Sequence, residues 1–323
     1  MATADQIKAL IKSHLRDDDQ RFIAVAMQVA AHAARQGHAR IAEEIRALVD
    51  QAKKDRRQPS QPVPIARPRG DLAALLSVSY PETRFADMVL SEEIRLSLQR
   101  ILREQRGRQK LLSHGLQPRR KLLLVGPPGS GKTMTASALA GELRLPLYTL
   151  LLHGLITKFM GETAAKLRLV FDALADQRGV YLFDEFDAIG GQRSAGNDVG
   201  EIRRVLNSFL QFLEQDESQS LIIAATNHPE ALDRALFRRF DDVLEYTAAP
   251  KDLARRVLRN RLAPFEVADI DWDAAASAAD GLSYADVVHA CEAAAKDAVL
   301  DDTLRVTTKA LTAALNDRRK GAR

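Results

Sequence analysis

A glycine-rich octapeptide between an apolar run and a helical pattern constrains this chain more than any other feature. It reads Gly126-Pro127-Pro128-Gly129-Ser130-Gly131-Lys132-Thr133, after the run KLLLV at 121–125 and before MTASALAGEL. Glycines let main-chain N–H groups converge on phosphate oxygens, and the amino terminus of a helix adds partial positive charge. The segment therefore predicts a strand, a phosphate-binding P-loop and a helix, in that order.

The polar side chains at the end of this loop predict a nucleotide bound with a metal ion. Lys132 is placed to reach the β- and γ-phosphates of a nucleoside triphosphate, and the hydroxyl of Thr133 suits Mg²⁺. Met134 follows directly and belongs to the same predicted cofactor-binding stretch. We therefore expect both a triphosphate and Mg²⁺ as cofactors.

Two adjacent acids follow a second apolar run. The run VYLF at 180–183 ends at Asp184 and Glu185. At the end of a strand, Asp184 would hold the hydration shell of the metal, and Glu185 would orient and activate the water that attacks the γ-phosphate. Acids also flank strands as plain solvated caps, and the presence of the P-loop is what favours the catalytic interpretation.

A polar amide and two cations follow a third apolar run. SLIIAATN at 220–227 ends at Asn227, which at the ligand-binding edge of an α/β sheet can hydrogen-bond the γ-phosphate or the water. A simple turn asparagine before His228-Pro229 is the alternative. Farther on, the adjacent guanidiniums of Arg238 and Arg239 suit arginine fingers, which stabilise charge in phosphoryl transfer.

Apolar runs alternate with helical patterns from Phe85 onward. The runs lie at 121–125, 147–151, 179–183, 220–225 and 242–246. Short runs that are apolar throughout suit strands covered on both faces, so we expect an α/β sandwich with a parallel five-stranded sheet at 81–249. After Pro250 the patterns are helical only, at 251–262, about 271–279, 283–298 and 307–318, which predicts a small helical lid domain at 250–323.

The amino-terminal residues predict a separate helical unit. Residues 1–55 carry apolar residues at helical spacing in three stretches. A bundle this small buries little surface, so we expect a partner- or substrate-binding domain; packing on its own body is the alternative. Residues 56–80 follow as a predicted linker, because the prolines between 59 and 68 favour an extended backbone.

Composition excludes several classes of protein. With 46% hydrophobic residues the chain has enough apolar surface for real cores, which excludes wholesale disorder. The longest apolar run falls well short of the ~20 residues that span a bilayer, and the polar start MATADQIKAL does not resemble a secretion signal. We therefore expect a cytoplasmic protein without a membrane span. The single cysteine, Cys291, cannot form an intramolecular disulfide and is expected to be a buried, inert thiol.

The positive charge is concentrated in the predicted linker. The formal net charge is +4, and residues 56–70 hold four arginines and no acidic residue. The folded domains are therefore close to neutral, which argues against a broad nucleic-acid footprint on them. The seven histidines lack metal-ligand spacing and are expected at surface or packing positions.

From about Pro81 to the carboxyl end, these residues resemble the AAA family of ATPases, the group that includes katanin and spastin, within the AAA+ superfamily. ATNHPEALDRALFRRFD at 225–241 is similar to the family's second region of homology. The resemblance implies that ATP is the nucleotide, that Asn227 is a sensor, and that Arg238 and Arg239 reach into the site of an adjacent subunit. It also implies a homo-oligomeric ring, in its usual form a hexamer.

Two further segments are similar to the family with one departure each. DGLSYADV at 280–287 resembles the lid motif that contacts adenine and ribose, which implies contacts from Ser283 and Ala285, although Tyr284 replaces the usual glycine. FADMVLSEE at 85–93 resembles the segment before the P-loop, although Leu90 stands where a glycine is typical.

LITKFMGET at 155–163 is similar to the family's pore loop. By that resemblance Phe159, Met160 and Gly161 project into a central channel, where an aromatic beside a flexible side chain can grip any polypeptide without reading its sequence. Ordinary core packing of Phe159 and Met160 is the alternative. GGQRSAGNDVG at 190–200 would be a second pore loop or a plain connection, and Arg203 and Arg204 would be inter-subunit arginines or part of a solvated helix face.

These observations lead to one function with three rivals. We expect a ring-forming, Mg²⁺-dependent ATPase that unfolds or disassembles protein substrates. A nucleic-acid remodelling or loader ATPase is one alternative, and a scaffold that uses hydrolysis only as a timer is another. No HExxH occurs in the chain, which excludes the metalloprotease chemistry of membrane-anchored relatives within this sequence; a separately encoded protease, as in a bacterial defence module, is the third alternative.

Overall fold

The computed structural model describes residues 70–151, 160–186, 199–232, 234–265, 267, 270–303 and 305–321, together with Val29, Ala30, Glu43 and Pro68. The chain divides into two compact units, Met1–Ile65 and Ala66–Arg323. The strands and helices whose bounds are given below all lie in the second unit. Apart from Val29, Ala30 and Glu43, the helices predicted for residues 1–55 lie outside the described residues.

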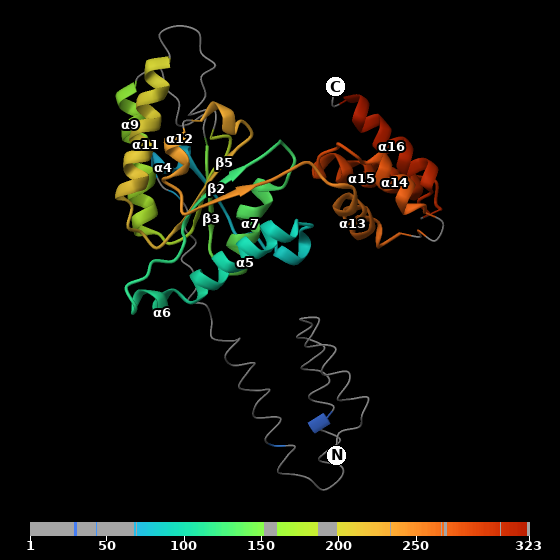
Figure 1. The fold of residues 1–323 in the computed structure, drawn as a ribbon, viewed down its shortest axis with the longest axis horizontal. Helices are drawn as coiled ribbons and strands as arrows, with labels where there is room; N and C mark the ends of the chain where they lie inside the picture. Colours follow the sequence, from blue (N-terminus) through green and yellow to red (C-terminus); the bar gives the residue numbers. More distant parts are fainter. Residues whose placement is uncertain are drawn as a thin grey trace. The chain divides into compact units, whose positions relative to one another are not determined.

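A six-stranded sheet forms the centre of the second unit (Figure 1). Its strands are β1 (Leu76–Ser79), β2 (Lys121–Val125), β3 (Leu147–Leu150), β4 (Val180–Phe183), β5 (Leu221–Thr226) and β6 (Asp242–Glu245). They are ordered β1-β3-β4-β5-β2-β6. All neighbouring pairs among β2 to β6 are parallel. The α/β class is therefore confirmed, and each predicted strand lies within one or two residues of its expected range.

The prediction of a five-stranded, wholly parallel sheet is wrong by one strand. β1 adds to the edge of the sheet, antiparallel to β3, with Leu76 opposite Leu150. It lies inside the predicted linker at 56–80, directly after the short helix α4 (Leu72–Leu75). The reason is that an antiparallel edge strand needs only one buried face, so its alternating pattern LSVS lacks the continuous apolar run of the central strands.

Helices cover both faces of the sheet. On one face, α9 (Met160–Asp176), α11 (Val199–Gln215) and α12 (Arg234–Phe237) pack over Leu123 and Phe183. On the other, α5 (Glu92–Arg106) and α7 (Lys132–Leu143) pack over Leu122 and Leu124. Alternate residues of β2 thus enter opposite cores, as the period of a strand requires. Because β2 to β6 are parallel, their carboxyl ends meet at one edge of the sheet.

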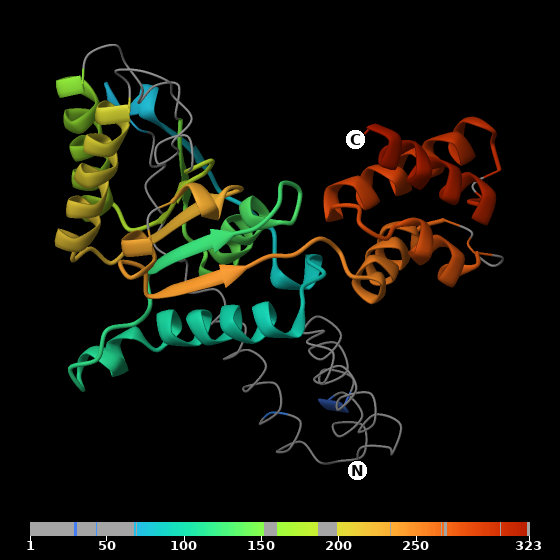
Figure 2. The ribbon, with the colours of Figure 1, turned by 45° about the horizontal axis from the view of Figure 1, so that its top comes forward.

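Four helices after Pro250 pack on one another, as Figure 2 shows. They are α13 (Lys251–Leu262), α14 (Trp272–Ala278), α15 (Tyr284–Leu300) and α16 (Thr308–Gly321). Cys291 is 1% exposed in their core, which confirms that the thiol is buried, and burial raises its pKa to about 12. No helix among the described residues is both long and apolar enough to cross a membrane.

Candidate active site

The P-loop lies at the carboxyl end of β2, and its backbone adopts conformations that favour glycine. Gly126 has φ +146° and Gly129 has φ +70°, values that side-chain-bearing residues rarely adopt. A Cβ added to Gly126 would lie 2.3 Å from the carbonyl oxygen of Tyr246, and one added to Gly129 would lie 2.7 Å from Oγ of Ser283. The loop thus turns sharply and passes close to β6 and to the lid.

Lys132 is buried, with 6% of its surface exposed, and its ammonium group donates to oxygen acceptors of the P-loop and of the segment after β5. Nζ donates to the carbonyl oxygens of Gly126 at 2.7 Å and Pro127 at 2.9 Å, and to Oδ1 of Asn227 at 2.8 Å. Asn227 follows β5, the neighbour of β2 in the sheet. The structure therefore brings the predicted sensor amide and the P-loop lysine together.

The hydroxyl of Thr133 and the carboxylate of Asp184 meet beside this lysine. Thr133 Oγ1 donates to Asp184 Oδ2 at 2.7 Å, although the two residues belong to different elements, the start of α7 and the end of β4. A hydroxyl and a carboxylate are hard oxygen donors of the kind that Mg²⁺ prefers. The pair fits the metal role that the sequence predicts for both residues.

Glu185 occupies an uncommon backbone conformation. Its φ is +50°, and its N–H donates to Oδ1 of Asp184 at 2.9 Å. The next residue, Phe186, is fully buried and donates its N–H to the carbonyl oxygen of Ala225 at 2.8 Å. Left-handed backbone at a non-glycine residue costs about 1–3 kcal/mol and clusters at functional sites. The surroundings hold Glu185 there with its side chain exposed.

These residues line one cleft of about 420 Å³. Its walls are Pro128, Gly129, Ser130, Gly131, Lys132, Thr133, Met134, Asp184, Glu185, Asn227, Arg261, Tyr284, Ala285, Val288 and His289. The lid closes directly on the P-loop, because the N–H of Ala285 donates to the carbonyl oxygen of Gly129 at 3.1 Å. Larger cavities exist in the described part of the chain, but this cleft alone among them combines the P-loop with the paired acids.

Sequence reasoning missed four lid residues of this wall, Arg261, Tyr284, Val288 and His289. In the sequence, Tyr284 stands out only as a replacement for glycine, and His289 only as one of the histidines expected at surface or packing positions. No spacing rule would have found Arg261, because the helical pattern of α13 does not reveal which turn faces the P-loop. The predicted Ser283 caps α15, with Oγ accepting from the N–H of Asp286 at 3.1 Å.

A buried hydroxyl pair beneath the loop was also missed. The hydroxyl groups of Thr135 and Tyr246 lie 2.6 Å apart, and Thr135 Oγ1 donates to the carbonyl oxygen of Gly131 at 3.1 Å. Burial raises the pKa of Tyr246 well above its ordinary value, so its phenol stays neutral. The pair ties α7 to β6 under the P-loop.

The remaining predicted residues lie elsewhere. Arg238 and Arg239 follow α12, are exposed, and do not line the cleft of their own chain. Arg239 forms an ion pair with Glu214. Phe159 and most of 190–200 lie outside the described residues, as do the side chains of Met160, Arg203 and Arg204. Met160 and Gly161 are the first two residues of α9.

Comparison with known proteins places this geometry in a family. The profile of the family described as "ATPase family associated with various cellular activities (AAA)" matches residues 122–248. An uncharacterised AAA family ATPase of Sinorhizobium fredii is 33% identical over 322 residues, which are 98% of this chain and 96% of that protein. The resemblance noted in the sequence is thereby confirmed.

Two further relatives match parts of the chain. The ATP-dependent zinc metalloprotease FtsH 4 of Sphaerobacter thermophilus is 34% identical over 231 residues, 69% of this chain but only 35% of that protein. The crystal structure of the FIGL-1 AAA domain shares the fold, with a TM-score of 0.60 and 24% identity over 75% of this chain and 85% of that one. With a P-loop cleft of this geometry and a relative aligned along nearly its whole length, the chain belongs to the AAA family of ATPases.

Proposed function

We propose that this chain hydrolyses Mg²⁺·ATP in the cleft between the P-loop and the lid. One observation carries the proposal: polar side chains from the segments that follow β2, β4 and β5 line a single cleft. Asn227 binds the ammonium group of Lys132, and Thr133 binds Asp184 beside it. Phosphoryl transfer needs chiefly positioning and neutralisation of charge, and this cluster supplies both kinds of group.

Each residue of the cluster has a definite task in this proposal. The N–H groups of the P-loop and the amino terminus of α7 bind the phosphate oxygens, and Lys132 neutralises their charge. Thr133 and Asp184 hold Mg²⁺, which when bound offsets charge on the β- and γ-phosphates. Glu185 orients the attacking water and accepts its proton, and Asn227 directs the γ-phosphate. Ala285 couples the lid to the loop through its hydrogen bond to Gly129.

The cations that complete hydrolysis come from a second copy of the chain in this proposal. Arg238 and Arg239 are exposed and stand apart from the cleft of their own chain. A guanidinium supplied in trans stabilises the charge of the transition state, typically by a factor of about 10³–10⁵. A head-to-tail arrangement that closes on itself forms a ring, which we propose to be a hexamer.

We propose a polypeptide as the substrate of this ring. Phe159, Met160 and Gly161 stand at or just before the start of α9, where a loop can carry an aromatic grip. The metalloprotease relatives act on proteins, as their name states, and the near-neutral folded part of the chain gives nucleic acid little to bind. Binding through residues 1–55 and cooperation with a separately encoded protease are further parts of the proposal.

ATP turnover measured with and without a protein substrate tests this function. Glu185→Gln is expected to bind ATP normally and to lower kcat by about 10²-fold or more, because only the water-activating group is lost. Phe159→Ala is expected to keep basal ATPase activity and to lose unfolding of a protein substrate. If unfolding persists in Phe159→Ala while binding of nucleic acid is lost, the chain is a nucleic-acid remodeller instead.

A further inference from the structure

The turn that carries Arg238 and Arg239 has little helical support of its own. It follows α12, which is only four residues long, and leads through Phe240 into β6. Phe240 is 8% exposed and packs in the core beneath α9 and α11. Both arginines are exposed. Something beyond α12 must therefore fix where the two guanidiniums point.

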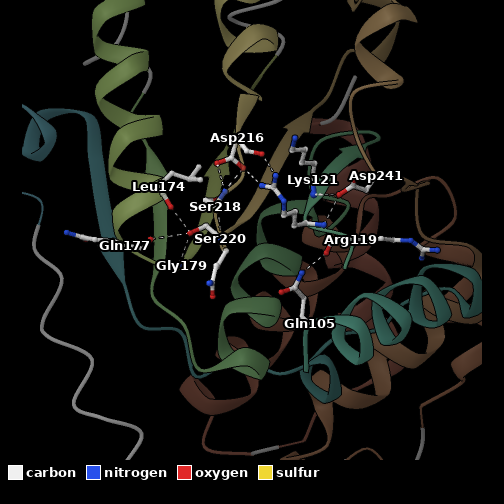
Figure 3. A network of polar contacts seen from close by, with 12 residues as sticks. Gln105, Arg119, Lys121, Leu174, Gln177, Gly179, Asp216, Ser218, Ser220 and Asp241 are labelled. Atoms are coloured by element: carbon white, nitrogen blue, oxygen red, sulfur yellow. Dashed lines mark hydrogen bonds and ion pairs between the residues drawn. The ribbon is translucent and has the colours of Figure 1, made fainter. Parts of the chain in front are cut away.

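Asp241, the residue after Phe240, binds the turn to the amino end of β2. Its Oδ2 accepts from the N–H of Arg120 at 2.8 Å and of Lys121 at 2.9 Å. Its own N–H donates to the carbonyl oxygen of Lys121 at 2.7 Å. Figure 3 shows the carboxylate of Asp241 beside Lys121. Three hydrogen bonds thus join this one residue to two residues of the neighbouring chain segment.

The same segment of β2 is anchored in turn to the end of α11. The guanidinium of Arg120 binds both the carboxylate and the carbonyl oxygen of Asp216. The two side chains are only 12% and 4% exposed, so water screens this pair little. Ser218 donates its N–H to Asp216 Oδ1 at 3.2 Å, and its Oγ accepts from the N–H of Ser220 at 3.2 Å.

Further hydrogen bonds connect Ser220 to α9 and to the residue before β4 (Figure 3). Oγ of Ser220 donates to the carbonyl oxygen of Leu174 at 3.0 Å and accepts from the N–H of Gly179 at 3.2 Å. The end of α11 also contacts the turn directly, because Glu214 forms an ion pair with Arg239. Asp241 holds the main chain of the turn, and Glu214 holds one of its side chains.

We propose that Asp241 is a positioning residue for the arginine fingers, acting through its bonds to Arg120 and Lys121. This inference rests on the proposed function, because it assumes that Arg238 and Arg239 act on a neighbouring copy. Asp241 bonds the amino end of β2, whereas the P-loop follows the carboxyl end of this strand. Loss of Asp241 is therefore expected to leave the ATP cleft of its own chain intact. A displacement of about 1 Å in a catalytic group can lower a rate about 10²-fold.

Mixed rings test the inference. Asp241→Ala alone is expected to lower kcat by about tenfold or more, with KM for ATP within about twofold of the wild type. Mixed in equal amounts with Glu185→Gln, which keeps intact fingers, it should regain activity, because its competent cleft then meets a competent neighbour. With random mixing, about a quarter of the sites combine both conditions.

Three further proteins keep the test decisive. The double variant Arg238→Ala, Arg239→Ala is also mixed with Glu185→Gln. The ATPase activity that this mixture regains is the reference for a protein that lacks the arginine fingers. Asp242→Ala is the matched control: the carboxylate of Asp242 accepts from Arg119 at 3.4 Å and from the N–H of Val243, not from the main chain of β2. This variant should leave kcat within about twofold of the wild type. Asp241→Asn keeps an acceptor oxygen and the fold, and its kcat should lie between those of Asp241→Ala and the wild type.

The outcomes separate the inference from the function. If the arginine variant is rescued by Glu185→Gln and the Asp241 variants are not, the inference is overturned and the function stands. A raised KM for ATP at unchanged kcat would also overturn it, because Asp241 would then act through the P-loop. If the arginine variant is not rescued either, the use of fingers in trans fails, and the inference fails with it.

Discussion

At the scale of single residues, the site depends on backbone conformations that ordinary side chains avoid. Gly126 and Gly129 let the P-loop turn, and Glu185 is held at φ +50° between a bonded Asp184 and the buried Phe186. The positions of the P-loop and of the Glu185 carboxylate thus depend on uncommon main-chain conformations, which the neighbouring strands and the lid keep in place.

Gly129→Ala is expected to weaken ATP binding at least tenfold, because a Cβ there would lie 2.7 Å from Oγ of Ser283 and push the lid from the loop. Gly115→Ala is the matched control, since Gly115 has nearly the same φ, +72° against +70°, with nothing within 4 Å of the added Cβ. Both variants should lose about 1 kcal/mol of stability from strain. Titration with a fluorescent ATP analogue measures the difference, and equal binding by the two variants would contradict the expectation.

The spacing of the motifs predicted which residues carry the chemistry, but it did not predict which other side chains lie beside them in the cleft. Lys132, Asp184 and Asn227 come together as expected because each belongs to a segment that follows a parallel strand, and the carboxyl ends of parallel strands meet at one edge of the sheet. Arg261 and His289 could not be found this way. Their place in the cleft depends on how the lid lies against the sandwich, which is set by packing and leaves no local pattern.

At the scale of elements, the lid meets the P-loop through the first turn of α15. Ser283 caps this helix in a reciprocal box with Asp286, and Ala285 donates to Gly129. α14 is capped in a similar way by Asp271, which accepts from the N–H groups of Asp273 and Ala274 at 3.0 Å. One capped helix therefore lies at the nucleotide cleft and the other away from it.

Removal of either cap should cost similar stability but affect ATP binding differently. Ser283→Ala and Asp271→Ala are each expected to lower the free energy of unfolding by about 1 kcal/mol, measured by urea denaturation. Only Ser283→Ala should also raise the Kd for ATP, because it loosens the turn that holds Ala285 against Gly129. A comparable loss of ATP affinity in Asp271→Ala would show that global stability, not this contact, governs binding.

The thiol in α15 makes the stability of the lid depend on alkaline pH. Burial raises the pKa of Cys291 from 9.0 to about 12, so the folded state keeps the proton that the unfolded chain loses above pH 9. Stability is therefore full below pH 9 and falls as the pH rises towards 12, by about 1.4 kcal/mol at pH 10. Urea unfolding at pH 8 and pH 10 measures the loss, and Cys291→Ala should show a smaller one; an equal loss in that variant would assign it to other groups.

At the scale of the whole molecule, the sequence predicted the sandwich and lid but not the edge of the sheet. Central strands can be recognised in the sequence as continuous apolar runs. β1, in contrast, buries only one face and lies among residues predicted to form a linker. Fold class thus follows from doubly covered strands and helical periods. The addition of β1 to the edge of the sheet depends on its pairing with β3, which a four-residue alternating stretch cannot specify by itself.

In the proposed mechanism, one copy of the chain supplies the cleft and the next copy supplies Arg238 and Arg239. ATP turnover per protomer, measured across protein concentrations that span assembly, tests this arrangement most directly, with sedimentation run on the same samples. We predict turnover near zero where only single protomers sediment, and a steep rise as larger assemblies form. Constant turnover per protomer down to concentrations that contain only single protomers would contradict the account.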